Sequence, residues 1–440
     1  MLVRAEPRRF RQALAALFVL ALVTRLLFML ATPRHYYAGD SEDYHALARG
    51  LLEGKGYVHP VTGALYAIRS PGYPLLVAGV YSLLGQGETP IKLLQVVVDS
   101  FSCLLVAVIA ARLFTRREGV LAGALYAGSA AHMAATVLLM AETIASFGIL
   151  VVAWLLLVAK QRAQGWRWFV VGLVLGVVLL VKGQFVFCPP LFALLLYHWS
   201  GRKLRATLPR VGWLLLGTML ALTPWTLRNY AAFHRFVPIA NQGGEVFYSA
   251  INPRQGKLQG FYVKDETALR IHQLPEAEQS DAFRRAAIDH VLHHPVAALR
   301  VTLLKYVFLF SPIDWELLPN AQIGAAGLLN PSYAFVAPFF LIGVVIAIKR
   351  RDDRAWLPLA LVVNLLVMTL AVHGGPRMRL PSESFFVVLA SYGLCRLAAL
   401  DLRRLLIASG VYASLLVCAF VSSVELRAGA RAVLHSAGLW

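Results

Sequence analysis

The chain has 440 residues, of which 58% are hydrophobic and 15% are charged, and its mean hydropathy is +0.64. These values exclude an ordinary soluble protein and indicate an integral membrane protein. The formal net charge of +19 would suit a nucleic-acid-binding protein. However, the cations cluster at the ends of hydrophobic segments, and no RNA- or DNA-binding motif is present, so we expect no nucleic-acid partner.

The N-terminal sequence MLVRAEPRRFRQ precedes about 19 mostly apolar residues, which are enough to span a bilayer. We expect an uncleaved first helix with its N-terminus in the cytoplasm. Further hydrophobic runs follow, and we expect an all-α membrane protein of about eleven transmembrane helices. The runs cover about 12–31, 91–113, 118–137, 143–160, 168–182, 184–199, 210–227, 332–349, 355–372, 383–400 and 405–423.

Clusters of Lys and Arg with few acids follow alternate hydrophobic runs, so we place that face in the cytoplasm and the C-terminus outside. The composition, rich in Ala, Leu and Arg, suits the cytoplasmic (inner) membrane of a bacterium. The segment 72–86 is apolar but short, and both of its flanks are then external, which predicts an interfacial or re-entrant helix. For 295–311, Arg300 and Lys305 favour a helix on the outer surface.

We treat 1–440 as a single membrane domain with two long external segments. The first, 32–90, is the expected catalytic segment, and the second, 228–331, is the expected acceptor side. No internal repeat is visible, which disfavours a transporter built from inverted repeats.

Cysteines and histidines give no sign of a metal site or a disulfide. No CxxC, HxxxH or HExxH spacing occurs, so no metal ligands are predicted, and we expect the cysteines to be small core residues. They are Cys103, Cys188, Cys395 and Cys418. Arg25, Asp99 and Asn364 lie inside apolar runs, where polar side chains tie helices together.

Three carboxylates, Asp40, Glu42 and Asp43, stand at the start of a helix predicted for 40–53. One interpretation is helix capping, with Asp40 as the N-cap and Asp43 as its capping-box-like partner. The other is catalysis, since a carboxylate held just outside the membrane can act as a general base on a substrate hydroxyl.

Arg69 precedes Pro71 and Pro74, where it is placed to bind a phosphate bidentately or to contact lipid headgroups. Glu142 stands at the external junction of two apolar runs without a cation nearby in the sequence. Such an acid is a candidate functional residue, and capping of the next helix by Glu142 or Thr143 is the alternative.

Cations recur in further external connections, and we expect the helices to bring them to one anionic site. They are Lys182, Arg228, Arg377 and Arg379.

These residues resemble the sequences of one family. GDSEDYHALARGLLEGKGY, from residue 39, and RSPGYPLLVAGVYSLLG, from residue 69, are similar to the start of polytopic GT-C glycosyltransferases. The bacterial relatives of protein O-mannosyltransferases and of the lipid A aminoarabinose transferase are the most similar. The likeness continues at 141–143, 223–248 and 377–394, and so covers most of the chain.

The resemblance implies a GT-C-like fold and a role for individual residues. Asp40 matches the proposed catalytic base, but Ser41 replaces the glutamate that often follows it, so Glu42 or Asp43 would compensate. Arg69 matches a phosphate ligand, Glu142 matches the acid at the second external junction, and Arg377 and Arg379 match the late RxRLP block. Lys182 fits less clearly.

The resulting hypothesis is inverting transfer of a sugar from a polyprenyl-phosphate sugar to an acceptor hydroxyl on the outer face of the membrane. The acceptor would be an envelope glycan, a lipid or a protein. Asp40 would remove the proton, and the cations would stabilise the departing phosphate. No cofactor is required, although the sequence leaves a divalent metal open. A lipid or polysaccharide transporter (or flippase) and a structural subunit of an envelope complex are the alternatives.

Overall fold

The computed structural model describes residues 8–32, 40–161, 164–252, 265–314 and 328–397. Helices form nearly all of the regular structure of this part of the chain, as expected, and one two-residue antiparallel ribbon joins β1 to β2. The first ten helices are α1 (Arg8–Ala31), α2 (Ser41–Leu52), α3 (Gly72–Leu84), α4 (Glu88–Leu113), α5 (Arg116–Ala127), α6 (Ala130–Thr136), α7 (Glu142–Lys160), α8 (Gly165–Val181), α9 (Cys188–Trp199) and α10 (Leu204–Phe233). The remaining elements are α11 (Gly243–Ile251), α12 (Glu266–His272), α13 (Glu276–His293), α14 (Pro295–Leu309), β1 (Ile313–Asp314), β2 (Leu328–Leu329), α15 (Pro331–Arg350), α16 (Trp356–Ala371) and α17 (Pro376–Leu397), with 3-10 turns at Gly183–Phe185 and Asp353–Ala355.

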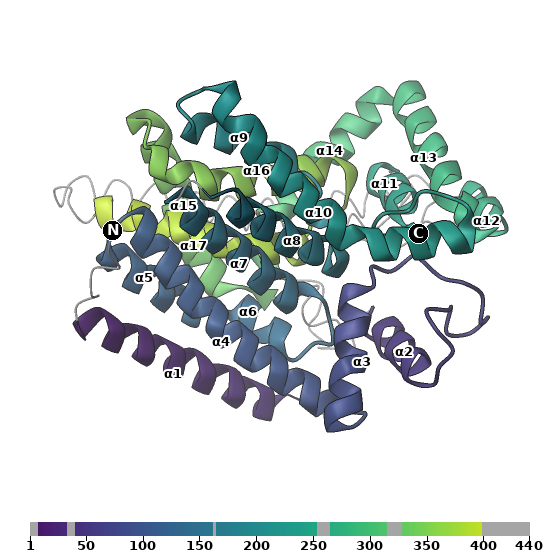
Figure 1. Cartoon of the computed structure of the whole chain (residues 1–440), viewed down its shortest axis with the longest axis horizontal. Helices are drawn as coiled ribbons and strands as arrows, with labels where there is room; N and C mark the ends of the chain where they lie inside the picture. The colour runs from purple at the N-terminus through teal and green to yellow at the C-terminus, as the bar shows by residue number, and fades with distance from the viewer. Residues whose placement is uncertain (1–7, 33–39, 162–163, 253–264, 315–327, 398–440) are drawn as a thin grey trace.

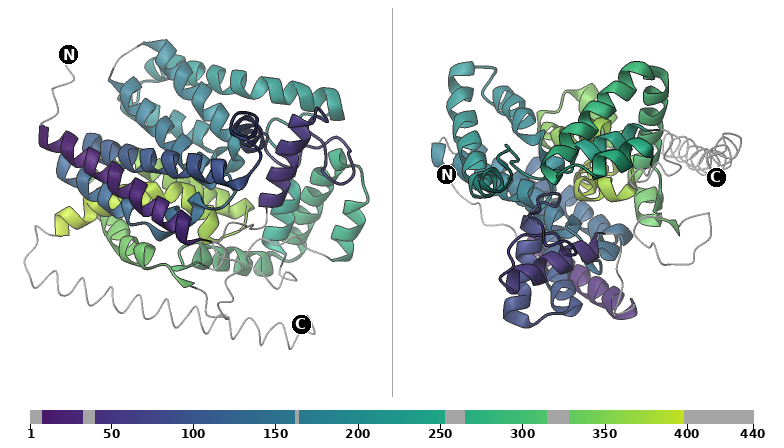
Figure 2. Two further views of the ribbon diagram at one scale, coloured as in Figure 1. Left: turned by 90° about the horizontal axis from the view of Figure 1, so that it is seen from below. Right: turned by 90° about the vertical axis from the view of Figure 1, so that its right-hand side faces the viewer.

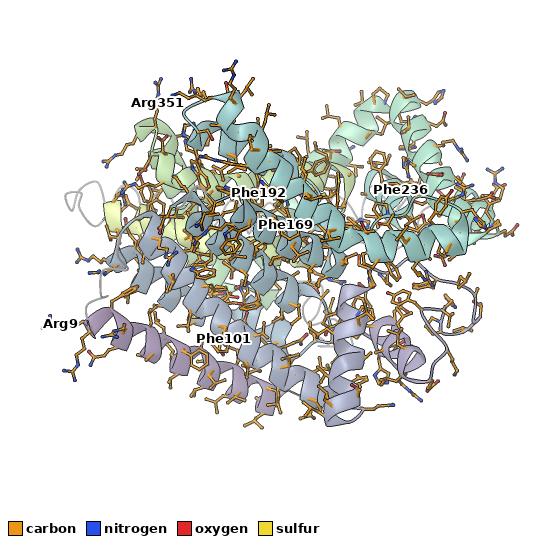
Figure 3. All side chains as sticks on the ribbon, viewed as in Figure 1. Arg9, Phe101, Phe169, Phe192, Phe236 and Arg351 are labelled. Carbon is orange, nitrogen blue, oxygen red and sulfur yellow. The ribbon has the colours of Figure 1, made fainter. Side chains whose placement is uncertain are left out.

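The long helices form a bundle in which α1 and α4 lie side by side (Figure 2). At one end of the bundle lie α2, α3 and α11–α13 (Figure 1). The labelled residues Arg9 and Arg351 both lie at the opposite end (Figure 3). Helices α2, α3 and α11–α13 belong to the two segments predicted to be external, so these parts of both segments lie at one end, and two of the predicted cytoplasmic basic clusters lie at the other.

Six helical segments of the described residues are long and apolar enough to cross a membrane, so the expected count of about eleven is not confirmed. They are α1, α4, α7, α10, α15 and Asp353–Ala371. At a rise of 1.5 Å per residue, the 12-residue helices α5 and α9 are too short for a full crossing. The last predicted run, 405–423, lies outside the described residues.

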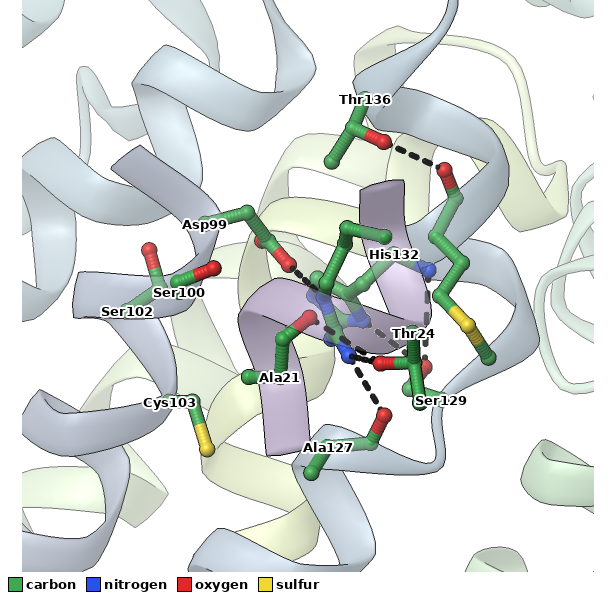
Figure 4. Close-up of polar contacts among 12 residues, drawn as sticks. Ala21, Thr24, Asp99, Ser100, Ser102, Cys103, Ala127, Ser129, His132 and Thr136 are labelled. Carbon is green, nitrogen blue, oxygen red and sulfur yellow. Dashed lines mark hydrogen bonds and ion pairs between the residues drawn. The ribbon is translucent and has the colours of Figure 1, made fainter. Parts of the chain in front are cut away.

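The run 118–137 does not form the single span that its apolar length predicts, because α5 ends at Ala127 and the short α6 begins at Ala130. Arg25 of α1 satisfies the carbonyls at this break by donating to Ala127 O at 2.5 Å and to Tyr126 O at 3.0 Å. Its charge is balanced by Asp99 of α4 at 2.8 Å (Figure 4). Asp99 also accepts a hydrogen bond from the Tyr126 hydroxyl. The expectation that Arg25 and Asp99 tie helices together is confirmed.

The Arg25–Asp99 pair is fully buried, which predicts a large loss of stability when one partner is removed. We expect Arg25→Met to lower the free energy of unfolding by about 3–5 kcal/mol, since Asp99 then stays buried without its counter-charge. Thermal unfolding in detergent, with the exposed Arg11→Met as the control on the same helix, measures the effect. Equal melting temperatures for the two variants would show that the pair contributes little.

The helix α8, which Lys182 follows, packs closely against α10. A Cβ at Gly172 would lie 1.9 Å from Leu214 O, and a Cβ at Gly217 would lie 2.1 Å from Phe169 O. Only glycine allows the two backbones to approach this closely, as is common between membrane helices.

The segment 295–311 forms α14, and its two cations differ in environment. Arg300 is exposed, as expected for a surface helix, but Lys305 is buried, so the surface prediction is wrong for Lys305. The ammonium group donates to Leu370 O at 3.0 Å, one of the last carbonyls of α16, which have no partner within their own helix.

Candidate active site

Asp40 immediately precedes α2, but its side chain makes no capping hydrogen bond, so the capping interpretation is wrong. The carboxylate instead binds two arginines that are distant in the sequence. Oδ1 lies 2.7 Å from Arg69 Nη2, and Oδ2 lies 2.6 Å from Arg377 Nη2. Asp40 thus links the first external segment to the start of α17.

Arg69 lies in the loop before α3, and its side chain is only 10% exposed. Its guanidinium also binds Asp43 Oδ2, at 2.7 Å from Nη2 and 3.1 Å from Nε. The backbone is held in turn by the hydroxyl of Tyr57, which donates to Arg69 O at 3.0 Å. The residue therefore lies in a fixed loop, with its charge directed at the two carboxylates of the α2 start.

Glu142 begins α7 and is almost fully buried, and its Oε2 accepts no hydrogen bond from the described residues, so it caps no backbone N–H. Its Oε1 accepts from Arg377 Nε at 2.6 Å and from Lys182 Nζ at 2.5 Å. The cations that pair with Glu142 are thus distant in the sequence: Lys182 lies 40 positions away from it, and Arg377 lies 235 positions away. Buried charges are stable only when they are paired in this way.

Together these contacts form one continuous chain of alternating charges, which we call the charge cluster. It contains three carboxylates and three cations, so it is electrically balanced. In order of contact its members are Asp43, Arg69, Asp40, Arg377, Glu142 and Lys182. Asp43 at one end has a side chain that is 42% exposed, whereas Glu142 is 2% exposed, so the cluster runs from an open surface into the protein.

The electrostatics of Asp40 follow from its neighbours. Burial raises the pKa of the Asp40 carboxyl, but the guanidiniums of Arg377 and Arg69 outweigh burial and hold the pKa well below its usual range. Asp40 is therefore an anion in this arrangement. It is also a weak base for as long as Arg377 and Arg69 both bind it.

The structure does not bring three predicted residues into the charge cluster. Glu42 is exposed, so of the two acids expected to compensate for Ser41 only Asp43 lies in the cluster. Arg228 donates to Tyr66 O at 2.8 Å and Tyr57 O at 2.6 Å, which fixes the loop before Arg69.

Arg379 is the third of these residues, and it is fully buried. It binds Glu383 at 2.9 Å and donates to Leu309 O and Ser311 O, while its guanidinium lies 3.3 Å from the Tyr333 ring centre. Its guanidinium thus joins α17 to the end of α14.

Residues of the segment 228–331 pack against the loop that carries Arg69, which no local sequence pattern predicts. Gln242 Oε1 lies 3.5 Å from Arg69 Nη1, and Asn241 N donates to Ala67 O at 2.8 Å. Ala67 N donates to Glu276 Oε1 at 2.6 Å. Gln242 is thus a further polar neighbour of the cluster, and it belongs to the segment expected to serve the acceptor.

Among the described residues, no group of three His, Cys, Asp or Glu side chains is arranged to hold a metal ion. Each carboxylate of the charge cluster faces a cation. The arrangement offers a base in Asp40 and positive charges that an incoming anion can share. A buried guanidinium and an ammonium next to a carboxylate suit phosphate release coupled to proton removal.

Residues 68–226 match the family described as dolichyl-phosphate-mannose-protein mannosyltransferase. This range contains Arg69, Glu142 and Lys182, whereas Asp40 and Arg377 lie outside it. No curated protein matches the chain.

The whole fold resembles solved membrane proteins. The archaeal oligosaccharyltransferase AglB from Archaeoglobus fulgidus, in complex with an inhibitory peptide and a dolichol-phosphate, has a TM-score of 0.57 at 13% identity, covering 94% of this chain and 56% of that chain. An Archaeoglobus fulgidus oligosaccharyltransferase in the apo form has a TM-score of 0.54 at 16% identity, covering 92% of this chain and 52% of that chain. ArnT from Cupriavidus metallidurans, bound to undecaprenyl phosphate, has a TM-score of 0.43 at 14% identity, covering 89% and 79%. This chain spans about half the length of the archaeal protein, and at this identity the likeness shows the fold alone.

Proposed function

We propose that the chain is a GT-C glycosyltransferase that moves a sugar from a polyprenyl-phosphate donor to an acceptor hydroxyl. The family match over residues 68–226 and the fold shared with the archaeal oligosaccharyltransferase support this proposal. Transfer occurs on the outer face of a bacterial cytoplasmic membrane and inverts the anomeric centre. The observation that carries the proposal is the contact of Arg377 with both Asp40 and Glu142, because it joins a candidate base to a cluster of cations.

In the proposed reaction, the donor phosphate binds Arg377, Lys182 and Arg69 in place of part of their carboxylate contacts. The acceptor oxygen attacks the anomeric carbon, and the bond from that carbon to the phosphate oxygen breaks. The phosphate keeps the electron pair, which the cations stabilise. Asp40 takes the proton of the acceptor hydroxyl.

This exchange of partners also explains how a carboxylate with a low pKa serves as a base. Arg377 and Arg69 cause the low pKa of Asp40 in the free protein. When the phosphate shares these cations, their effect on Asp40 weakens and burial raises the pKa. Donor binding thus prepares Asp40 for proton removal.

Two features of the bundle support the orientation. Arg9 and Arg351 mark the end that we place in the cytoplasm (Figure 3), and α2, which follows Asp40, lies at the other end (Figure 1). The acceptor, an envelope glycan, lipid or protein, meets the site from the 228–331 side, where Gln242 approaches Arg69.

The test is turnover by purified protein in nanodiscs with a panel of polyprenyl-phosphate sugars and candidate acceptors. We expect polyprenyl phosphate to be released from one donor, with or without EDTA, because cations of the charge cluster neutralise the phosphate. Loss of release on chelation would assign that role to a metal. Movement of the intact donor across the bilayer without release would support a transporter instead.

The pH dependence of kcat/KM, which reports the free protein, should reflect the low pKa of Asp40. A depressed pKa keeps the carboxylate charged as the pH falls, so protonation of Asp40 should not reduce kcat/KM between pH 7 and about pH 5. In Arg377→Gln the pKa of Asp40 rises, so the fall of kcat/KM on the acidic side of the pH profile should occur at higher pH. Identical acidic limbs for the two proteins would contradict the assignment of Asp40 as the base.

A further inference from the structure

A second site of interest lies away from the charge cluster, where the N-terminal end of α1 meets α5. The two helices leave an open groove of about 580 Å³ between them. Arg9, Arg116 and Arg117 line it together with an apolar wall that includes Phe10, Val120 and Leu121.

The three arginines have no carboxylate within ion-pair distance among the described residues. Glu118, which directly follows Arg117, is instead paired with Arg396 of α17, and Glu6, the acid closest to Arg9 in the sequence, lies outside the described residues. Three like charges around one groove repel each other, and a bound anion would relieve that repulsion. The positive charge of the groove therefore favours binding of an anion.

The apolar wall indicates which class of anion binds in the groove. A small polar anion would gain nothing from Phe10, Val120 and Leu121, whereas an amphiphile places an acyl chain there and its phosphate among the arginines. Access from the bilayer is direct, because only 17% of the membrane-crossing stretch of α1 is buried inside the protein. Basic pockets at the cytoplasmic ends of membrane helices suit anionic lipid headgroups.

We propose that this groove binds an anionic glycerophospholipid of the surrounding membrane, with its phosphate held by Arg9, Arg116 and Arg117. The lipid joins α1 to α5, which are also joined by Arg25. The site differs from the proposed donor site, since α1 has 24 residues and is roughly 36 Å long, and the groove lies at its first turns. The inference does not depend on the proposed function.

Native mass spectrometry of the purified full-length chain tests the site, with phosphatidylglycerol and phosphatidylcholine as probes. We expect the wild type to bind phosphatidylglycerol about tenfold more tightly, and Arg116→Gln/Arg117→Gln to lose most of that preference. Lys349→Gln/Arg350→Gln is the matched control, because it removes two exposed cations that do not line the groove.

Ala124→Trp distinguishes a groove from a merely basic surface. Ala124 is exposed and lines the groove, so tryptophan fills the space while all three arginines remain. We expect this variant to lose the preference as well. Equal losses in the control variant, retained binding in Ala124→Trp, or tighter binding of polyprenyl phosphate than of phosphatidylglycerol would each overturn the proposal.

Discussion

Asp40→Asn is expected to lower turnover of the lipid-linked donor by about 10²–10⁴-fold, the range for loss of a general base. An amide cannot take the proton of the acceptor hydroxyl at neutral pH, whereas the size of the side chain is unchanged. The structure also predicts that the variant folds. Arg69 still forms an ion pair with Asp43, and Arg377 still forms one with Glu142, so neither guanidinium is left without a carboxylate.

The matched control for Asp40→Asn is Glu42→Gln, which removes an exposed carboxylate of the same helix start. Its turnover should equal that of the wild type. The two proteins are compared in kcat and in KM for the donor, with the melting temperature recorded for each. A kcat for Asp40→Asn within a few-fold of the wild type would exclude Asp40 as the base, even if the protein proves to be a glycosyltransferase.

The sequence predicted local structure where one helix determines it. The bounds of α7, α8, α15 and α16 lie within a few residues of the predicted apolar runs. The prediction of a single span for 118–137 was wrong. Ser129 caps a new helix at the centre of this run, and Arg25, about a hundred positions earlier, donates to the carbonyls that α5 leaves free. Hydropathy contains no information on such a partner.

At the candidate site, too, the sequence predicted individual residues but not which distant residues contact one another. Asp40, Arg69, Glu142, Lys182 and Arg377 were all predicted as site residues, and the structure brings them together. The sequence could not predict that Arg377 joins this cluster and Arg379 does not. The two arginines are two residues apart and stand in the same sequence motif.

On α17 these two arginines point to different partners. Arg377 meets carboxylates from two other segments, and Arg379 meets backbone carbonyls at the end of α14. Helix geometry separates side chains at i and i+2, but only the packing of neighbouring helices decides which side faces the site.

Arg377→Lys should lower turnover by about 10²-fold although it keeps the positive charge. Arg377 binds Glu142 through Nε and Asp40 through Nη2, both at 2.6 Å. The two contacts depend on separate N–H donors held in the plane of the guanidinium. The single ammonium group of lysine, on a flexible side chain, does not reproduce this geometry. Loss of one preorganised group that stabilises transition-state charge typically costs about 10²–10³-fold in kcat.

Arg379→Lys is the comparison that separates chemistry from folding. It loses the two bonds to Leu309 O and Ser311 O, so we expect a lower melting temperature but little change in kcat per folded molecule. Arg377→Lys should show the reverse, because Lys182 continues to neutralise the buried Glu142. If the two variants instead lost stability and turnover in parallel, Arg377 would be a structural tie like Arg379, and the phosphate would have to meet Lys182 and Arg69 without it.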